Sequence, residues 1–273
     1  MASQYDIIGA KYDLLKQLPA AIIESENLKN AVLPYLSKAP QLRPRVLDLA
    51  CGTGYYSHHL IGWGAGHVLG IDQSRGMIDA ANATLSAEER ERGVIQFRIG
   101  DALDLAKTIV DDEGGPFDVV VGAWLLNYAS GLDEMTRMFR TVSASLGDGG
   151  GGVFVGVTPH PVDDVDAFAR MTNEFEREQP CKWGLSVNYL RRLESGEGWR
   201  TEIVVPGEHE VRFRNYHLPK EVYERAARQG GMRGELRWKK IEMPKRALEM
   251  MGEEFWQPYF VKGPHLGILI VEK

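Results

Sequence analysis

The feature that most constrains the fold of this chain is an apolar strand that leads into an acidic residue and a glycine turn. Residues 46–56 read VLDLACGTGYY, with Asp48 near the strand end and Gly52 and Gly54 in the turn. Glycine adopts positive φ easily and lets the backbone approach a ligand closely. Open α/β sheets bind their ligands at the carboxyl ends of parallel strands. The segment therefore predicts a Rossmann-like α/β sheet with a ligand site after its first strand.

The turn departs from the dinucleotide-binding pattern at one position. A G-x-G-x-x-G motif would place a third glycine at position 57, where this chain has Ser57. The carboxylate of Asp48 would repel a pyrophosphate but attract an ammonium or sulfonium group, because opposite charges attract strongly in a partly dry cleft. The sequence therefore favours S-adenosylmethionine, which carries both cations, and a nicotinamide dinucleotide stays as the alternative.

A second apolar strand, residues 68–71, ends in Asp72 and Gln73, and Asp72 comes 24 residues after Asp48. This is about the spacing at which the second strand of such a sheet delivers an acid to the ribose hydroxyls. Met77 opens the next helix, where a soft thioether is able to lie on an adenine ring. Its alternative role is that of a core residue on an amphipathic helix.

Two further segments fit the same sheet. Residues 95–102 alternate as a strand does and finish in Asp101 and Ala102, where a carboxylate is placed to accept the adenine amino group. Residues 117–128 are apolar on both faces, as expected of a central buried strand. We expect the end of this strand, from Ala123 onward, to lie beside the reactive methyl group.

Together these motifs resemble those of class I S-adenosylmethionine-dependent methyltransferases over about residues 1–158. Within that superfamily the chain is similar to the small-molecule branch typified by toxoflavin synthase and the gliotoxin-pathway N-methyltransferase of fungi. The segments that carry this narrower likeness are YDIIGAKYDLLKQLP, LLNYA, RNYHLPKEVYERAARQGG and EEFWQPYF. The resemblance implies methyl transfer to a nitrogen or oxygen of a small molecule, a secondary metabolite.

The resemblance also implies which residues hold the cofactor. They are Asp48, Ala50, Gly52 and Gly54 for the methionine end, Asp72, Gln73 and Met77 for ribose and adenine, Asp101 and Ala102 for the adenine edge, and Tyr12 and Ala123 near the methyl group. Ala50 stands where many relatives have glycine. Because alanine tolerates most backbone shapes other than positive φ, we expect little harm from this difference.

The chain divides into a core and the segments that cover it. We predict N-terminal lid helices in 1–40, a cofactor-binding Rossmann-like core in 41–159, a substrate-cap insertion after strand five in 160–217, and completion of the seven-stranded sheet in 218–273. The insertion is expected to hold a polar helix and a hairpin made from two alternating runs, 199–205 and 210–216. We expect the insertion and the lid helices to bind the methyl acceptor.

The acceptor chemistry is less constrained. An amine acceptor needs no base, whereas a phenol or thiol needs a group that removes its proton. The candidate bases are His217, at the end of the hairpin, and His160, after the fifth strand, although either could instead be a surface or capping residue. Tyr12 and Tyr128 are the other candidate catalytic residues. Residues 122–124 read Gly-Ala-Trp rather than a carboxylate cluster, so no metal site is predicted.

Composition excludes several classes of protein. The 273 residues carry a net charge of −6, which argues against the basic face that general nucleic-acid binding needs. No apolar stretch approaches the roughly 18 residues of a membrane span. Two cysteines are too few for a disulfide framework. We therefore predict a cytoplasmic enzyme with neither nucleic-acid nor membrane partners, and its oligomeric state is open. The remaining alternatives are a nicotinamide oxidoreductase and a protein that binds S-adenosylmethionine without catalysis or to promote a rearrangement.

Overall fold

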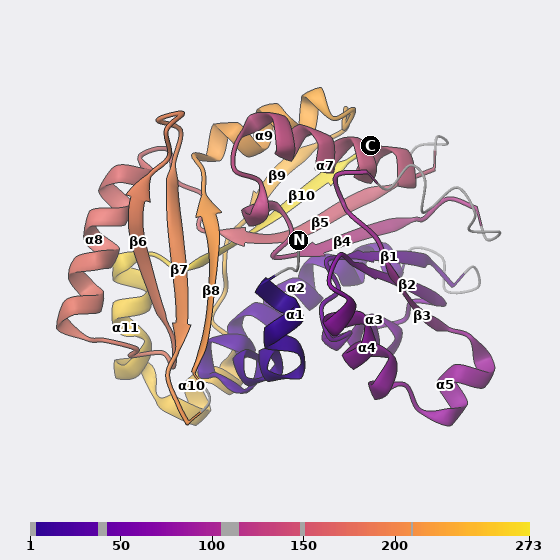
Figure 1. The fold of residues 1–273 in the computed structure, drawn as a ribbon, viewed down its shortest axis with the longest axis horizontal. Helices are drawn as coiled ribbons and strands as arrows, with labels where there is room; N and C mark the ends of the chain where they lie inside the picture. The colour runs from indigo at the N-terminus through magenta and orange to yellow at the C-terminus, as the bar shows by residue number, and fades with distance from the viewer. Residues whose placement is uncertain (1–3, 38–42, 105–114, 148–150, 209) are drawn as a thin grey trace.

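A mostly parallel, seven-stranded sheet forms the centre of the protein. The computed structural model describes residues 4–37, 43–104, 115–147, 151–208 and 210–273, and Figure 1 shows its ribbon. The strand order is β3-β2-β1-β4-β5-β10-β9. The strands are β1 (Arg45–Leu49), β2 (His67–Asp72), β3 (Ile95–Ile99), β4 (Val119–Ala123), β5 (Val153–Pro159), β9 (Leu236–Lys239) and β10 (Leu266–Glu272). The prediction of a Rossmann-like seven-stranded sheet is confirmed.

The strand order reverses between β1 and β4. β1 pairs in parallel with β2 on one side and with β4 on the other. β10 runs antiparallel to both β5 and β9. A crevice forms outside the carboxyl ends of the strands where the order reverses, and sheets of this type bind their ligands there. The ends of β1 and β4 are therefore where a site is expected.

Helices cover both faces of the sheet (Figure 1). The helices on one face are α2 (Pro19–Leu36), α3 (Tyr55–Gly62) and α4 (Arg75–Thr84), and those on the other are α7 (Leu132–Ser145) and α9 (Lys220–Gln229). Successive strand residues alternate between the two cores: Val46 packs in the cluster that contains α2, and Leu47 in the cluster that contains α7. Burial on both faces explains why these strands read as continuous apolar runs.

The insertion after β5 consists of a helix and a three-stranded antiparallel sheet, which we call the cap. Its elements are α8 (Val165–Glu178), β6 (Ser186–Arg192), β7 (Trp199–Val205) and β8 (Val211–His217). The predicted hairpin corresponds to β7 and β8. The sequence analysis missed β6, an edge strand in which a register shift between Tyr189 and Arg191 breaks the alternation of side chains.

The remaining elements are short helices, most of them near the two ends of the chain. They are α1 (Gln4–Ile8) and the 3-10 helix η1 (Gly9–Gln17) before α2, α5 (Ala87–Arg92), the 3-10 helix η2 (Leu126–Tyr128), α10 (Lys245–Met251) and α11 (Glu253–Lys262). Helices α10 and α11 follow each other directly and are separated by Gly252. Gly252, with φ +79° and ψ 160°, ends α10 because this backbone conformation is open almost only to glycine. The predicted boundary after residue 40 lies outside the described residues.

Gly230 allows α9 to pack closely on α7. A Cβ at this position would lie 2.3 Å from the Cβ of Phe139 and 2.9 Å from its carbonyl carbon, so one helix must move. Gly230→Ala should therefore lower the free energy of unfolding by about 1–3 kcal/mol, as overpacking does. Chemical denaturation measures the change.

The matched control is Gly62→Ala at the end of α3. Nothing lies within 4 Å of a Cβ added there, and alanine favours a helix over glycine by up to about 1 kcal/mol. The control variant should be as stable as the parent protein or slightly more so. Equal unfolding free energies for the two variants would contradict this account of the α7–α9 contact.

Candidate functional site

In the described part of the chain, three cavities meet at the carboxyl ends of the central strands. The inner cavity, at the end of β1, has a volume of about 550 Å³. The outer cavity, at the ends of β2 and β3, has about 710 Å³. The cap cavity lies under the cap sheet and has about 770 Å³. Each of the three cavities is lined in part by residues of the N-terminal segment.

Most of the predicted cofactor residues line the first two cavities. Those around the inner cavity are Tyr12, Asp48, Ala50, Gly52, Asp72, Met77 and Ala123, and those around the outer cavity include Ala50, Asp72, Gln73, Asp101 and Ala102. Gly54 lies behind them at the start of α3 with φ +84°, and a Cβ there would come within 2.5 Å of the Phe97 ring. The structure thus brings residues from the ends of four strands, β1 to β4, to one site.

Asp48 is a buried carboxyl group with one hydrogen bond from a described residue, donated by Ser57 Oγ at 2.7 Å. Burial raises the pKa of Asp48 to about 7; the Ser57 hydrogen bond acts against this rise, and the nearby carboxylate of Asp72 adds to it. A cation bound in the inner cavity would favour the ionised form of Asp48. This side chain is therefore suited to an ammonium or sulfonium group.

The expectation that Ala50 would avoid a positive φ is wrong. Ala50 has φ +60° and Gly52 has φ +56°, so the turn after β1 is left-handed at both residues. A left-handed alanine is strained by about 1–2 kcal/mol, and such strain is usually found at functional sites. The turn that results directs the backbone N–H of Gly52 to Asp72 Oδ2 at 3.0 Å.

Asp72 lies between the inner and outer cavities and lines both. Its Oδ2 accepts from Gly52 N–H, and its Oδ1 accepts from Ser74 N–H at 2.9 Å. Burial raises the pKa of Asp72, and these two backbone hydrogen bonds oppose the rise. Both oxygens retain lone pairs that are able to accept from ligand hydroxyl groups. The carboxylate is therefore held in a fixed orientation.

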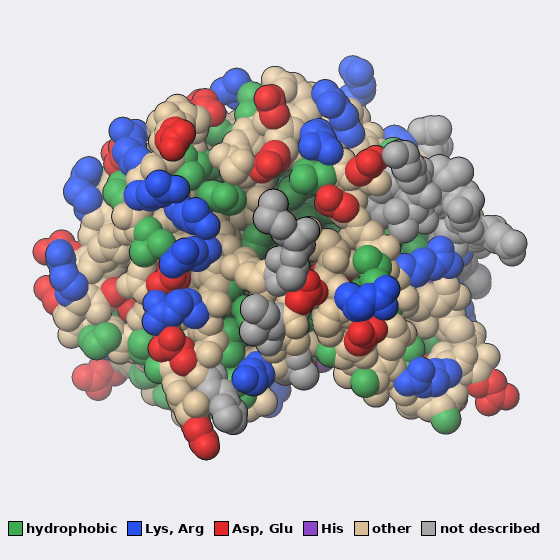
Figure 2. Space-filling model, viewed as in Figure 1, with side chains coloured by type: hydrophobic (Ala, Val, Ile, Leu, Met, Phe, Trp, Pro, Cys, Tyr) green, Lys and Arg blue, Asp and Glu red, His purple; other side chains and the backbone are tan. Residues whose placement is uncertain are grey.

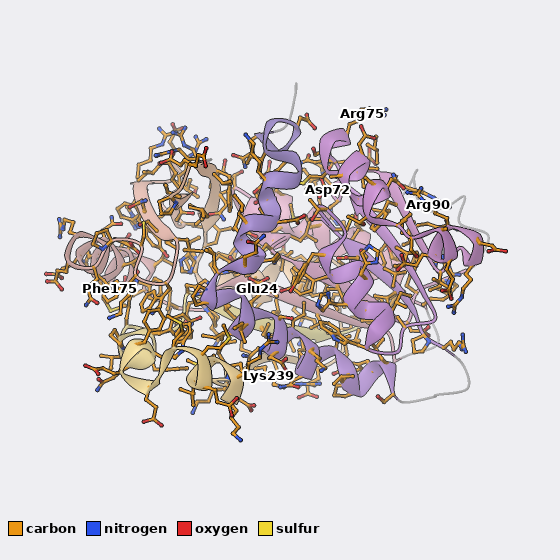
Figure 3. All side chains as sticks on the ribbon, turned by 90° about the horizontal axis from the view of Figure 1, so that it is seen from below. Glu24, Asp72, Arg75, Arg90, Phe175 and Lys239 are labelled. Atoms are coloured by element: carbon orange, nitrogen blue, oxygen red, sulfur yellow. The ribbon has the colours of Figure 1, made fainter. Side chains whose placement is uncertain are left out.

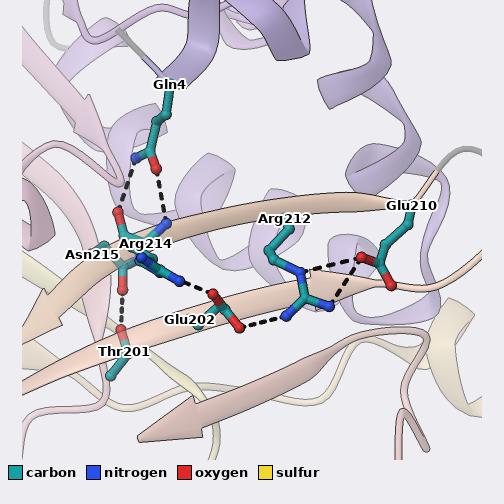
Figure 4. Close-up of polar contacts among 7 residues, drawn as sticks. All are labelled: Gln4, Thr201, Glu202, Glu210, Arg212, Arg214 and Asn215. Carbon is teal, nitrogen blue, oxygen red and sulfur yellow. Dashed lines mark hydrogen bonds and ion pairs between the residues drawn. The ribbon is translucent and has the colours of Figure 1, made fainter. Parts of the chain in front are cut away.

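Helix α1 connects the cap to the core through the side chains of Gln4 and Asp6. Gln4 Nε2 donates to the carbonyl oxygen of Arg214 at 2.9 Å, and Arg214 N–H donates to Gln4 Oε1 at 3.0 Å (Figure 4). On the other side, Asp6 Oδ1 accepts from Ser74 Oγ at 2.6 Å at the start of α4. We call Gln4, Tyr5 and Asp6 the clasp.

Tyr5, in the middle of the clasp, lines both the inner and the outer cavity. Its hydroxyl forms a hydrogen bond with the hydroxyl of Tyr128. Its ring lies 5.7 Å from the ring of Tyr12, as expected for two tyrosines on one side of the N-terminal segment. The clasp therefore closes over the region between the two cavities.

The cap cavity is walled mainly by aromatic and apolar side chains. The inner face of the cap sheet contributes Val187, Tyr189, Ile203, Phe213 and Asn215, and the N-terminal segment contributes Leu15 and Leu18. Four residues line both this cavity and the inner cavity: Tyr12, Lys16, Trp124 and Tyr128. These four residues form a wall that the inner and cap cavities share. A group that passes from a ligand in one cavity to a ligand in the other must cross this shared wall.

The shared wall is held by Glu24, a residue that the sequence analysis missed. Its buried carboxylate accepts from Lys16 Nζ at 2.5 Å, from the Tyr56 hydroxyl at 2.5 Å and from Trp124 Nε1 at 2.9 Å. Figure 3 shows Glu24 beside the N-terminal helices, in the middle of the molecule. Burial alone would raise the pKa of Glu24, but Lys16 and the hydrogen bonds lower it below its usual value.

Of the two predicted histidine bases, one lines the cap cavity and the other does not. His217 lines the cavity, but its Nε2 donates to the carbonyl oxygen of His160 at 2.8 Å, and its Nδ1 bonds the Tyr189 hydroxyl at 2.5 Å. The ring of His160 does not line the cap cavity and stacks on Phe168. Neither imidazole presents a free nitrogen to the cavity in this arrangement.

A third histidine, His265, lines the cap cavity, and the sequence analysis did not select it. His265 immediately precedes β10. Because β10 is antiparallel to β5, its beginning lies at the same sheet edge as the carboxyl ends of the parallel strands. The reversed direction of this strand is the signal that would have identified His265.

The outer face of the cap sheet carries charged side chains of both signs (Figure 2). Arg212 and Arg214 are both paired with Glu202, at 2.6 Å and 2.9 Å.

In the part of the chain that the structure describes, no group of three or more potential ligand side chains is arranged for a metal ion. Among the same residues, no helix is both long and apolar enough to cross a bilayer.

Comparison with known families supports an assignment of the core. Residues 46–150 match the family described as "Methyltransferase domain". A demethylmenaquinone methyltransferase of Clavibacter sepedonicus is 36% identical over 51% of this chain and 54% of its own length. A malonyl-[acyl-carrier protein] O-methyltransferase of Magnetococcus marinus is 33% identical over 39% of each chain. The chain thus spans about half the length, or less, of these curated relatives.

Solved structures share the fold across almost the whole chain. A Listeria monocytogenes protein assigned as an S-adenosylmethionine-dependent methyltransferase superposes with a TM-score of 0.57 at 20% identity, covering 94% of this chain and 99% of that one. The methyltransferase CcbJ of Streptomyces caelestis superposes with a TM-score of 0.56 at 16% identity, covering 89% and 94% of the two chains. The shared fold therefore extends beyond residues 46–150 and includes most of the cap.

The raised pKa of Asp48 makes cofactor binding depend on pH. Near pH 6 the empty site holds mostly protonated Asp48, and the ammonium group of S-adenosylhomocysteine should drive that proton off. We expect binding to release up to about one proton at pH 6 and much less at pH 9. Calorimetry in buffers of different ionisation enthalpy counts the protons. Asp48→Asn is the control, and equal proton release by variant and parent at pH 6 would contradict this role.

The clasp should slow the escape of the cofactor. Asp6→Ala removes a charged acceptor from Ser74 Oγ, and a hydrogen bond to a charged group contributes about 1.5–3 kcal/mol. We expect S-adenosylhomocysteine to dissociate about 10-fold faster or more, as measured by stopped-flow displacement. Lys11→Ala, at an exposed position on η1, is the matched control. If the two variants released the ligand at the same rate, the clasp would have no part in retention.

The residues present fit the cofactor, because Asp48 offers a carboxyl group to the methionine ammonium and Asp72 offers two oxygens to the ribose. The strand order, the domain match and the structural neighbours agree on the same class. Residues 46–150 match a methyltransferase domain, the chain has the Rossmann-like fold of solved S-adenosylmethionine-dependent methyltransferases, and its site fits S-adenosylmethionine as the cofactor.

Proposed function

We propose that the protein transfers the methyl group of S-adenosylmethionine to a nitrogen or oxygen of a small molecule bound under the cap, without a metal ion. The observation that carries the proposal is the wall shared by the inner and cap cavities, made of Tyr12, Lys16, Trp124 and Tyr128. A methyl donor on one side and an acceptor on the other would face each other across this wall. Holding two reactants in line is most of what such an enzyme contributes.

The lining of the cap cavity favours an acceptor that is small, largely apolar and uncharged. Its aromatic walls suit a flat ring, and a few polar groups would orient it, as is usual in small-molecule sites. The charges of Lys16 and Glu24 are paired with each other at 2.5 Å. Burial lowers the pKa values of His217 and His265 to about 4, so both rings are neutral near pH 7. A ring-bearing secondary metabolite fits this environment.

The named relatives are consistent with more than one acceptor class. One is named for demethylmenaquinone, and the other for a malonyl group on a carrier protein. The aromatic lining of the cap cavity favours a ring over a flexible chain on a carrier. Both cysteines are free, and this supports a reducing location such as the cytoplasm.

Transfer of a radiolabelled methyl group tests the proposed function. With methyl-tritiated S-adenosylmethionine and an extract of aromatic metabolites, we expect S-adenosylhomocysteine to form and the label to enter a small molecule. Excess EDTA should leave the rate unchanged. Asp72→Ala should lower kcat/KM by about 10- to 150-fold, because it removes charged acceptors from the ribose. Asp79→Ala, at an exposed position on α4, should behave as the parent protein.

The same mixture distinguishes the alternatives. A protein that binds the cofactor without catalysis would form no S-adenosylhomocysteine. One that promotes a rearrangement would change the small molecule but leave the label on the cofactor. A nicotinamide oxidoreductase would instead bind NADH and consume it. Reversible loss of activity on chelation would contradict the metal-independent mechanism.

A further inference from the structure

We propose that His265 is a catalytic residue that removes the proton of a hydroxyl acceptor through its Nε2 atom. This inference rests on the proposed methyl transfer. It adds a residue that the sequence analysis did not select. The base is then His265, just before β10, and not His217 at the end of β8.

His265 is held in the wall of the cap cavity by two aromatic neighbours. Its Nδ1 forms a 2.9 Å hydrogen bond with the Tyr259 hydroxyl. Its ring stacks on the indole of Trp124, with centroids 6.1 Å apart and planes 10° apart. Because Trp124 belongs to the shared wall, the imidazole lies one ring away from the place where the methyl group must cross.

The two ring nitrogens of His265 differ in their surroundings. Nδ1 is bonded to Tyr259, whereas Nε2 has no hydrogen-bond partner among the described residues and is not enclosed as a buried polar atom. In His217, the other histidine of this cavity, both nitrogens are engaged. Of the two histidines in the described wall, His265 is therefore the one with a nitrogen available to a ligand.

The charged groups near His265 leave it neutral. Burial is the main cause that lowers its pKa to about 4; the carboxylate of Glu24 acts against this, and Lys262 and His160 lower the pKa further. Nearly all of the imidazole is thus in the basic form at pH 7. With Nδ1–H donating to the Tyr259 oxygen, Nε2 carries the lone pair of a ring that lines the cap cavity. In this arrangement Tyr259 is the positioning residue.

A base of low pKa is sufficient for this reaction. When bound, S-adenosylmethionine supplies the methyl group and leaves as a thioether. As the acceptor oxygen gains its bond to carbon, its O–H bond becomes strongly acidic, and the proton moves to His265 Nε2. The imidazolium then returns the proton to solvent. A neutral amine acceptor needs no such step before its bond forms, because its lone pair is already available.

The first test does not depend on turnover. The protein saturated with S-adenosylhomocysteine is treated with diethyl pyrocarbonate, which modifies unprotonated imidazole nitrogens, and the sites are mapped by mass spectrometry. We expect modification of His265 and protection of His217. Tyr259→Phe should change the rate at which His265 is modified. Protection of His265 would overturn the proposal.

The second test compares two acceptors that share a ring, 6-hydroxyquinoline and 6-aminoquinoline. His265→Gln keeps a polar side chain but provides no base. At pH 7 it should slow methylation of the hydroxyl probe by about 100-fold or more, and methylation of the amino probe by less than about threefold. The deficit with the hydroxyl probe should shrink toward pH 10 as that group ionises unaided. His217→Gln is the matched control and should affect both probes equally.

The outcomes are distinguishable. If His265→Gln lowered the methylation rates of the two probes equally, or lowered neither rate, the assignment of His265 as the base would be overturned. Methylation of the amino probe alone by the parent protein would also overturn it. Methylation of neither probe would contradict the proposed function on aromatic small molecules. The modification of His265 by diethyl pyrocarbonate would still decide whether Nε2 is available.

Discussion

The buried carboxylate of Glu24 is the interaction on which the arrangement of the site depends. It joins Lys16 of η1, Tyr56 of α3 and Trp124 after β4, three segments far apart in the sequence. Breaking a buried ion pair by removing one partner costs several kcal/mol, because a charge is left without a counter-charge. Two of the four residues of the shared wall, Lys16 and Trp124, are therefore fixed by one acidic side chain on α2.

Trp124 shows why this support is needed. Its backbone has φ +63°, an unfavourable conformation for a residue with a large side chain. The backbone N–H of Trp124 donates to Val157 at 2.9 Å, and its indole donates to Glu24 at the same distance. Such strain persists only where the surroundings hold it. The indole in turn provides the surface on which His265 stacks, so the network extends from α2 to the start of β10.

The N-terminal segment links the two halves of the site. The clasp closes beside the inner and outer cavities, and Tyr12 and Lys16 of the same segment line the cap cavity. Movement of this segment would therefore open the cofactor site and dismantle the acceptor site together. Binding of the cofactor beneath the clasp would complete the wall against which an acceptor packs, and water would be excluded from both.

Much of the lining of the inner and outer cavities could be predicted because its signals are local. Asp48, Asp72 and Asp101 each lie at or just after the end of a strand that the sequence predicts, and the ends of parallel strands meet at one sheet edge. Strand β6 was missed because its register shift removes the alternation on which such predictions depend. Ala50 was misjudged because φ at one residue is set by the whole turn and not by the preference of alanine.

The sequence by itself determined the order of the elements, the ligand edge of the sheet and the identity of the cofactor, since each of these follows from periodicity and from short motifs. Only the tertiary structure decided which side chains line the cap cavity. Glu24 lies in the middle of a helix and His265 lies at the start of an antiparallel strand, so neither has a local signature. The burial of Glu24, its three partners and the free nitrogen of His265 arise from packing between distant segments, and no pattern within a short stretch of sequence encodes such contacts.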